Sequence, residues 1–357
     1  MRMTGKIRFK IGSRWVGDGE PLYVVAEAGV NHENNMKMAL QMIDEAAGAG
    51  AEAIKFQSYK AQRLASRNSP AYWDRTKEKS GSQYELFLRH DRFEVEDYVK
   101  LASHAEKKGI AFLATAFDEV FVDALADCLP AFKVASADIT HYPLLKRIAS
   151  KGKPVILSVG AATVEEVRNA VHVLHDKGCE DIALLHCILN YPCLPEKANL
   201  RAIRTWRKTF RDVVVGYSDH VPGGYGLLQL NVAWLMGAQI VEKHFTLNKN
   251  LVGNDHYHAM DPDDLRTFIQ QQEYLEKLLG TGQIGYSSAE ESARQFARRS
   301  LVASRDISAG ERVDEGMILI KRPGTGIEPK ELEIVMGKRA LVDIPEDTIL
   351  QWDMFEC

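Results

Sequence analysis

The sequence predicts a parallel (β/α)8 barrel (TIM barrel) followed by a small, mainly β domain. Eight short aliphatic runs each lead into a polar cluster, and most lie about 22 to 31 residues apart, which is the length of a strand plus a helix. The runs are too short and too apolar for half-exposed strands, so they are typical of strands buried on both faces. The eight runs are residues 22–26, 53–56, 110–113, 132–134, 154–157, 182–185, 213–215 and 239–241.

Helical patterns fill the gaps between these runs. Residues 36–49 and 225–236 carry apolar side chains at helical spacing, residues 163–175 open on a Thr-Val-Glu-Glu capping box, and residues 262–279 begin with two aspartates. One gap is longer and holds an extra stretch, residues 58–92. Eight βα units in about 280 residues favour a closed barrel, with a doubly wound open sheet as the alternative.

The chain is expected to have three parts. The barrel should cover residues 1–280, a linker rich in Gly and Ser residues 281–299, and a loop-rich β domain residues 300–357. The expected strands of that last domain are residues 301–303, 318–321 and 339–342. It is too short to bury a large core, so we expect it to pack on something else, such as a partner subunit.

Composition narrows the class of protein. The 357 residues carry a net charge of only −4, so neither nucleic acid nor an anionic membrane is the expected partner. No stretch approaches the roughly 20 apolar residues of a membrane span, and the first residues lack a signal-peptide core. The five cysteines contain no CxxC pair, which favours free thiols in a cytoplasmic protein. Cys187 has no obvious base, which favours a buried thiol over a nucleophile.

Polar residues gather where the predicted strands end. Because these ends form the active site of a βα barrel, their side chains should line one mouth. Lys55 and Lys133 each stand between apolar residues, and hydroxyl groups are available from Thr115, Ser136, Ser158 and Ser218. Two ammonium groups with several hydroxyl donors suit a phosphate, whereas the alternative places both lysines on the surface.

Two histidines, His220 and His244, follow the last two predicted strands and should face one another at that mouth. Two imidazoles with open positions for water and substrate suggest a divalent cation, and the ligand types suit Mn²⁺, Mg²⁺ or Co²⁺ at least as well as Zn²⁺. The alternative is a pair of hydrogen-bonded core histidines. Histidines on helical or linker patterns, such as His90, are expected to be structural. Four others are undecided: His32, His186, His256 and His258.

Seven short motifs, taken together, resemble the sialic acid synthase family, which comprises N-acetylneuraminate, legionaminate and pseudaminate synthases. The motifs are residues 26–32, 54–57, 133–136, 157–158, 216–220, 242–245 and 253–256. Residues 299–324 resemble that family's C-terminal antifreeze-like (SAF) domain. The resemblance implies condensation of phosphoenolpyruvate with an open-chain N-acylated hexosamine, giving a nine-carbon 2-keto acid and phosphate. It also implies a metal-dependent homodimer with exchanged SAF domains.

The resemblance also implies roles for individual residues. His220 and His244 would hold the metal, with Mn²⁺ the first choice and Mg²⁺ or Co²⁺ the alternatives. Phosphoenolpyruvate would bind to Lys55, Thr115, Lys133, Ser136, Ser158 and Ser218. The sugar would contact Gln57, Tyr191, Asn190, Asp255, Phe296 and Arg322, the last from the partner chain. For the carboxylate that orients the attacking water, Asp138 is our candidate and Glu27 the second.

Three departures from the family pattern fall on the sugar side. Asp138 stands where relatives often have Glu, Asn190 directly precedes Tyr191, and residues 257–261 replace a small and polar run. They indicate a substrate other than plain N-acetylmannosamine, for example a diamino or phosphorylated hexose derivative. Two other classes remain as alternatives: a metal-dependent hydrolase, for which His256-Tyr-His258 is the only His-x-His pair, and a carbohydrate-binding protein without catalysis.

Overall fold

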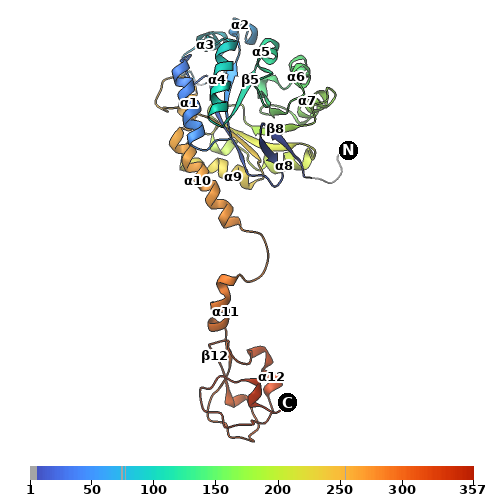
Figure 1. Cartoon of the computed structure of the whole chain (residues 1–357), viewed down its shortest axis with the longest axis vertical. Coiled ribbons are helices and arrows are strands. Elements are labelled where there is room, and N and C mark those ends of the chain that lie inside the picture. Colours follow the sequence, from blue (N-terminus) through green and yellow to red (C-terminus); the bar gives the residue numbers. More distant parts are fainter. Residues whose placement is uncertain (1–5, 74, 77, 254) are drawn as a thin grey trace. The chain divides into compact units, whose positions relative to one another are not determined.

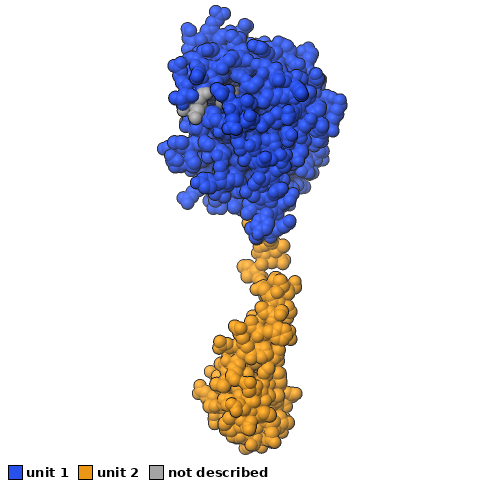
Figure 2. All heavy atoms as spheres, turned by 90° about the vertical axis from the view of Figure 1, so that its left-hand side faces the viewer, with its two compact units in different colours: residues 1–278 blue, residues 279–357 orange. Residues whose placement is uncertain are grey.

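The computed structural model describes residues 6–73, 75–76, 78–253 and 255–357. The chain divides into two compact units, Met1–Leu278 and Leu279–Cys357, which Figure 2 colours separately. Each unit has its own core. Among the described residues, no helix combines the length and the apolar character that a membrane crossing needs.

The first unit is a closed barrel of parallel strands in the order β10-β3-β4-β5-β6-β7-β8-β9, and helices surround the strands (Figure 1). The (β/α)8 prediction is confirmed, and the open sheet is excluded because β10 pairs with both β3 and β9. The strands are β3 (Tyr23–Gly29), β4 (Ala53–Ser58), β5 (Ala111–Ala116), β6 (Phe132–Val134), β7 (Val155–Ser158), β8 (Ile182–Cys187), β9 (Val214–Asp219) and β10 (Ile240–His244).

Helices fill the gaps between the strands as predicted. They are α1 (Met36–Gly48), α4 (Val95–Lys107), α5 (Glu119–Leu125), α6 (Tyr142–Ala149), α7 (Val164–His175), α8 (Ala202–Thr209), α9 (Leu228–Leu235) and α10 (Pro262–Leu279). Three of the four with predicted bounds, α1, α7 and α10, agree closely with them. Thr163 caps α7 in the predicted capping box. The helix predicted from residue 225 is wrong at its start, because Gly226 and Leu227 have φ of 62° and 58° and form a separate turn, η3 (Tyr225–Leu227).

Strand alternation explains where the barrel changes from apolar to polar. Side chains at every second position point inward. Near the amino ends these are apolar and pack with an N-terminal hairpin, β1 (Arg8–Ile11) and β2 (Arg14–Gly17), that the sequence patterns did not reveal. On three strands the next inward-facing residue, two positions further along, is polar. Lys55 follows Ala53 on β4, Thr115 follows Leu113 on β5, and Ser158 follows Ile156 on β7. The barrel therefore has an apolar floor and a polar mouth.

The long gap after β4 is an excursion over residues 58–92, which begins at the carboxyl end of that strand. It contains α2 (Ala61–Leu64) and α3 (Gln83–His90). An isolated bridge between Pro70 and Ser82 closes the loop between the two helices. This excursion starts at the barrel mouth, where the polar side chains are.

The second unit is small and built around two antiparallel strands, β11 (Ser300–Ala303) and β12 (Ile318–Lys321). Its own core includes Leu301, Ile307, Val313, Leu350 and Phe355. The segment expected to be a linker contains η5 (Ser288–Glu290) and α11 (Glu291–Ala297), because Ser287 and Glu290 form a capping box. The strand expected at residues 339–342 is absent from the described structure, where Arg339 and Ala340 make only isolated bridges.

Candidate active site

A cavity of about 480 Å³ lies at the carboxyl ends of the barrel strands. Most of the predicted site residues line it: Glu27, Lys55, Gln57, Thr115, Lys133, Ser136, Asp138, Ser158, Tyr191, Ser218, His220, His244 and Asp255. Asn190 is exposed and does not belong to this lining. Phe296 and Arg322 lie in the second unit. Asn254, within one of the family motifs, lies outside the described residues.

The two lysines are buried and surrounded by carboxylates. Lys55 Nζ lies 2.6 Å from Glu27 Oε2 and donates to Thr115 Oγ1 at 3.0 Å. Glu242 Oε1 lies 3.4 Å from Lys133 Nζ and 3.8 Å from Lys55 Nζ, so this carboxylate sits between the two ammonium groups. The sequence places Glu242 at a strand end, but no role was assigned to it. Its inward position on β10, two residues before His244, was the feature that could have indicated a site residue.

Burial and charge act in opposite directions in this network. Burial raises the pKa of Glu27, although Lys55 partly offsets it. For Glu242, burial opposes ionisation, but Lys133 and Lys55 outweigh it and lower the pKa. Burial lowers the pKa of Lys133, against the attraction of Glu242. Buried charges of this kind persist only when they are paired, so the two lysines and the two carboxylates stabilise one another.

The hydroxyl groups complete the same side of the cavity. Ser136 Oγ accepts from Gly160 N at 2.9 Å, and Ser218 Oγ donates to Glu242 Oε1 at 3.1 Å. Ser158 Oγ is buried and has no hydrogen-bond partner among the described residues. A buried hydroxyl without a partner costs roughly 1–3 kcal/mol, which a bound ligand would recover.

The two candidate catalytic carboxylates have different surroundings. Glu27 is held by Lys55 and by Gln57, whose Nε2 donates to Glu27 Oε1 at 3.1 Å. Asp138 lies on the turn η1 (Ser136–Asp138) directly after β6 and is half-buried. Burial raises its pKa to about 6, although His141 and Lys133 lower it somewhat. Within the described residues no hydrogen bond or ion pair restrains the Asp138 side chain, so it is the freer carboxylate of the two.

The predicted metal ligands face one another across the cavity. The ring centroids of His220 and His244 lie 5.5 Å apart, and the Tyr191 ring lies 4.1 Å from His220. His220 Nδ1 lies 2.8 Å from the carbonyl oxygen of Ile188. A proton on Nδ1 that is donated to this carbonyl leaves Nε2 free to bind a cation, as in many metal sites.

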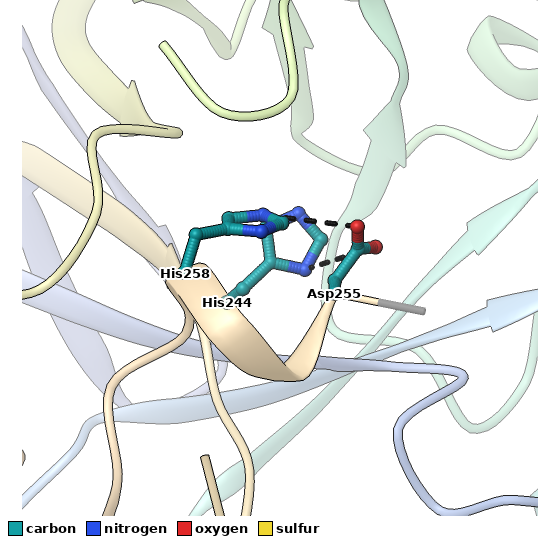
Figure 3. Close-up of side chains that lie close together, drawn as sticks. All are labelled: His244, Asp255 and His258. Atoms are coloured by element: carbon teal, nitrogen blue, oxygen red, sulfur yellow. Dashed lines mark ion pairs between the residues drawn. The ribbon is translucent and has the colours of Figure 1, made fainter. Parts of the chain in front are cut away.

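A second group of possible ligands shares His244. Figure 3 shows His244, Asp255 and His258 converging, with one ligand atom of each within 4.8 Å of the others. His244 Nδ1 is 3.5 Å from Asp255 Oδ2, and His258 Nε2 is 3.7 Å from Asp255 Oδ1. His258 lies on the turn η4 (His256–His258) after β10. The sequence left it undecided, although its place in a His-x-His pair directly after Asp255 was the available signal.

These side chains fit a divalent cation. His244 Nδ1 and both ring nitrogens of His258 are buried without a hydrogen-bond partner among the described residues. Burial, followed by the neighbouring histidines, holds the pKa of His244 and of His258 well below the usual value. Neutral imidazoles with free lone pairs are the form that binds metals.

The excursion over residues 58–92 forms an aromatic wall of the cavity. Tyr72, Trp73 and Phe87 come from this stretch, and the Phe87 ring lies 5.4 Å from that of Tyr59. His90, expected to be structural, also lines the cavity. Apolar and aromatic side chains beside a few polar groups are typical of sites for small organic ligands.

Cys187, for which a buried thiol was favoured, is buried and lines the cavity beside His220, with Sγ 3.8 Å from Nδ1. In the C-terminal unit, Phe296 is 57% exposed on α11, and Arg322 is exposed too. Their segments adjoin, because Gly324 N donates to Gln295 O at 2.9 Å. The unit therefore offers these two side chains from neighbouring segments.

Known proteins match this chain over nearly its whole length. Residues 42–284 match the model of the NeuB family, and residues 298–356 match the SAF domain. An uncharacterized protein of Methanocaldococcus jannaschii is 42% identical over 97% of this chain and 98% of its own length. The N,N'-diacetyllegionaminic acid synthase of Legionella pneumophila is 35% identical over 95% of this chain and 96% of its own length.

A solved structure agrees with these sequence matches. The N-acetylneuraminic acid (sialic acid) synthetase of Leptospira borgpetersenii, in complex with citrate, superposes with a TM-score of 0.71 at 32% identity, covering 82% of this chain and 96% of that one. Neither named enzyme is a hydrolase. The chain therefore belongs to the NeuB family, and its C-terminal unit carries a SAF domain.

Proposed function

We propose that the protein condenses phosphoenolpyruvate with an open-chain N-acylated hexosamine to a nine-carbon 2-keto acid and releases phosphate. The observation that carries this proposal is the pair of buried ammonium groups, Lys55 and Lys133, in the same cavity as the facing imidazoles of His220 and His244. One half suits a small anion and the other suits a cation that binds an aldehyde oxygen. The family of synthases to which the chain belongs supports the same reaction.

The anion half would bind phosphoenolpyruvate. Lys55 and Lys133 supply positive charge, while Thr115, Ser136, Ser158 and Ser218 supply hydroxyl groups. When the ligand arrives, its phosphate and carboxylate would share the ammonium groups with Glu27 and Glu242, so that no buried carboxylate is left without a partner. The same lysines then hold the charge of the departing phosphate, which is the step at which charge on that group increases.

The sugar half would orient the aldehyde. A divalent cation held by His220 and His244 would polarise the aldehyde oxygen as a Lewis acid. Gln57, Tyr191 and Asp255 line the same cavity as these histidines, and we assign them to the sugar hydroxyl and amide groups. The metal expected from the ligand types is Mn²⁺, with Mg²⁺ or Co²⁺ as alternatives.

The bonds change as follows. C3 of phosphoenolpyruvate attacks the sugar aldehyde carbon, whose oxygen becomes an alkoxide, and C2 acquires positive charge. Water adds to C2 and loses one proton to a carboxylate, for which Asp138 is the first candidate and Glu27 the second, and this proton balances the one that converts the sugar alkoxide to a hydroxyl group. The C2 hydroxyl then becomes the keto oxygen, its proton goes to the phosphate, and the phosphate leaves with the bridging oxygen as the bond from C2 to that oxygen breaks. Asp138 suits this role because its carboxylate is unrestrained and because Lys133, on the anion side, contributes to its electrostatic surroundings.

The C-terminal unit would complete the sugar end. We propose a homodimer in which the SAF domain of one subunit covers the barrel of the other, so that Phe296 and the partner-supplied Arg322 reach the substrate. The exposure of these two side chains supports the assignment, because both are available to a substrate. We place the reaction in the cytoplasm, which agrees with five free cysteines.

Phosphate release tests the proposal. The full-length protein would be incubated with phosphoenolpyruvate, Mn²⁺ and a panel of N-acylated hexosamines, including diamino and 6-phosphorylated members. We expect phosphate only when both substrates are present, together with a product whose mass equals the two substrates plus water minus phosphoric acid. Phosphate from phosphoenolpyruvate alone, or from a sugar phosphate alone, would contradict the proposal.

A further inference from the structure

His258 is the buried imidazole nearest the predicted metal pair that has no assigned role. We propose that His258 is a third imidazole ligand of the cation and that Asp255, besides its assignment to the sugar, supplies a carboxylate oxygen to the same ion. The inference rests on the proposed function only in requiring a cation at His220 and His244. A third imidazole gives the cation more nitrogen ligands than a pair of histidines does, and the number of nitrogen ligands affects which metal the protein binds.

The distances among the rings fit one shared ion. The centroid of His258 lies 5.0 Å from that of His244 and 6.4 Å from that of His220. With metal–nitrogen bonds of about 2.1 Å, the centroids of two imidazoles on one metal stand roughly 4.5–5.5 Å apart. The His244–His258 pair lies within this range and the His220–His244 pair, at 5.5 Å, lies at its upper edge. The rings of His220 and His258 would have to approach one another by about an ångström.

The carboxylate contacts fit the same arrangement. His244 Nδ1 and His258 Nε2 lie 3.5 and 3.7 Å from the two oxygens of Asp255. These separations are too long for good hydrogen bonds. They are close to the roughly 3.0–3.4 Å that separates neighbouring ligand atoms around a metal with bonds of about 2.1 Å. The atoms are therefore spaced as ligands and not as hydrogen-bond partners.

The neighbouring His256 shows what a structural histidine looks like on the same turn. Its Nδ1 lies 2.8 Å from Thr246 Oγ1, and its Nε2 lies 3.0 Å from Glu33 Oε1. His258 is equally buried, yet both of its ring nitrogens have no hydrogen-bond partner among the described residues. Because an unsatisfied buried polar group costs about 1–3 kcal/mol, the position of His258 is costly unless a ligand satisfies it.

A third imidazole changes the preferred metal. Nitrogen ligands favour the later first-row ions, whereas Mg²⁺ and Mn²⁺ prefer oxygen ligands. The site with His258 should therefore bind Co²⁺ or Zn²⁺ much more tightly than Mn²⁺. A site with only His220 and His244 would discriminate less between these ions.

Metal binding to the full-length, metal-free protein tests this without an activity assay. Affinities for Co²⁺ and Mn²⁺ would be measured by calorimetry, and the visible absorption of bound Co²⁺ would report its ligands. The variants are His258→Ala, His244→Ala and, as a matched control from the same turn, His256→Ala. Circular dichroism and thermal melting would confirm folding, and His258→Gln would replace the alanine variant if that one unfolds.

We expect His258→Ala to weaken Co²⁺ binding by about tenfold or more, because even second-shell changes cost that much. Mn²⁺ binding should weaken less, the Co²⁺ spectrum should change, and His256→Ala should leave both affinities unchanged. The proposal is overturned if His258→Ala binds Co²⁺ with the original affinity and spectrum, or if His256→Ala loses as much. Loss of Co²⁺ in His244→Ala but not in His258→Ala would reject this inference and leave the proposed function intact. Retention of Co²⁺ in both variants would also contradict the proposed metal site.

Discussion

The two sides of the cavity are built differently. The anion side places Lys55, Thr115, Lys133 and Ser158 on barrel strands, where pairing with neighbouring strands fixes each backbone position. The sugar side is formed mainly outside the strands, by His220, Tyr191, the turn η4 and the excursion that follows β4, although Gln57 on β4 and His244 on β10 also contribute.

This difference separates anion binding, which the reaction requires with every sugar, from sugar recognition, which can vary. A strand can present a side chain inward or outward only, so the anion side depends on a few residue types at fixed positions. Loops and turns tolerate changes in length and sequence, so the sugar side can change its substrate without altering the barrel. We therefore expect loss of a strand-borne ammonium group to impair the reaction with every sugar, and substitutions of the loop-borne sugar or metal ligands to change which sugar or metal is used.

The largest effect should come from the strand side. Lys133→Ala removes one of the two ammonium groups that hold the departing phosphate, so kcat/KM should fall by about a thousandfold. Steady-state phosphate release measures this, with Lys146→Ala on the exposed face of α6 as the control. A loss of less than tenfold would show that the lysine pair is not the anion site.

Asp138→Asn should lower kcat by about a hundredfold, because the side chain can no longer accept the proton of water. In the unaltered protein, kcat/KM should fall as the pH drops through about 6, since protonation of this carboxyl in the free enzyme removes the base. The pH profile of kcat/KM, with kcat of the variant measured alongside, checks both expectations. An unchanged acid limb in a variant that retains activity would assign the role to Glu27.

The same carboxyl should reduce stability at high pH. Its pKa in the folded protein, about 6, lies above the ordinary value of 3.8, so the folded state binds the proton more tightly. Stability is then greatest below the ordinary value and is lost as the pH rises through about 6. Asp138→Asn should raise the free energy of unfolding at pH 8 by about 1–3 kcal/mol and change little at pH 4. Urea unfolding at both pH values measures the difference, and equal changes would contradict the assignment.

Arg322→Ala should affect the sugar selectively. We expect the KM for the sugar to rise about tenfold, while the KM for phosphoenolpyruvate stays unchanged, because a lost charged hydrogen bond costs about 1.5 kcal/mol. Equal increases in both constants would count against a role at the sugar end.

Mixing subunits tests whether this arginine acts on the partner. At sugar concentrations well below the KM, dimers assembled from equal amounts of Lys133→Ala and Arg322→Ala chains should recover about a quarter of the original activity, since half of the dimers contain one intact site. No recovery after subunit exchange would place Arg322 on its own barrel.

The smallest effect should come from Ser158→Ala. Its hydroxyl has no partner within the described residues, so its removal should leave the melting temperature unchanged or slightly higher. The KM for phosphoenolpyruvate should rise about fivefold if the hydroxyl binds this substrate. A fall in melting temperature with an unchanged KM would assign Ser158 to the fold alone.

The sequence revealed the barrel because buried parallel strands leave a regular pattern of short apolar runs, and most predicted site residues sit at their inward ends. It missed features that depend on contacts distant in the chain. The N-terminal hairpin shows no repeat that relates it to the barrel floor, although Phe9 and Ile11 pack there. His258 remained undecided because its approach to His244 depends on the path of the turn after β10.

The most direct test of the central claim follows oxygen from water. The reaction would be run in ¹⁸O-enriched water with phosphoenolpyruvate, Mn²⁺ and the best sugar of the panel, and the released phosphate examined by mass spectrometry. Water attacks C2 in the proposed reaction and the C–O bond breaks, so the phosphate should contain no ¹⁸O. One ¹⁸O atom per phosphate would mean that water attacks phosphorus, as in a hydrolase, and would contradict the account.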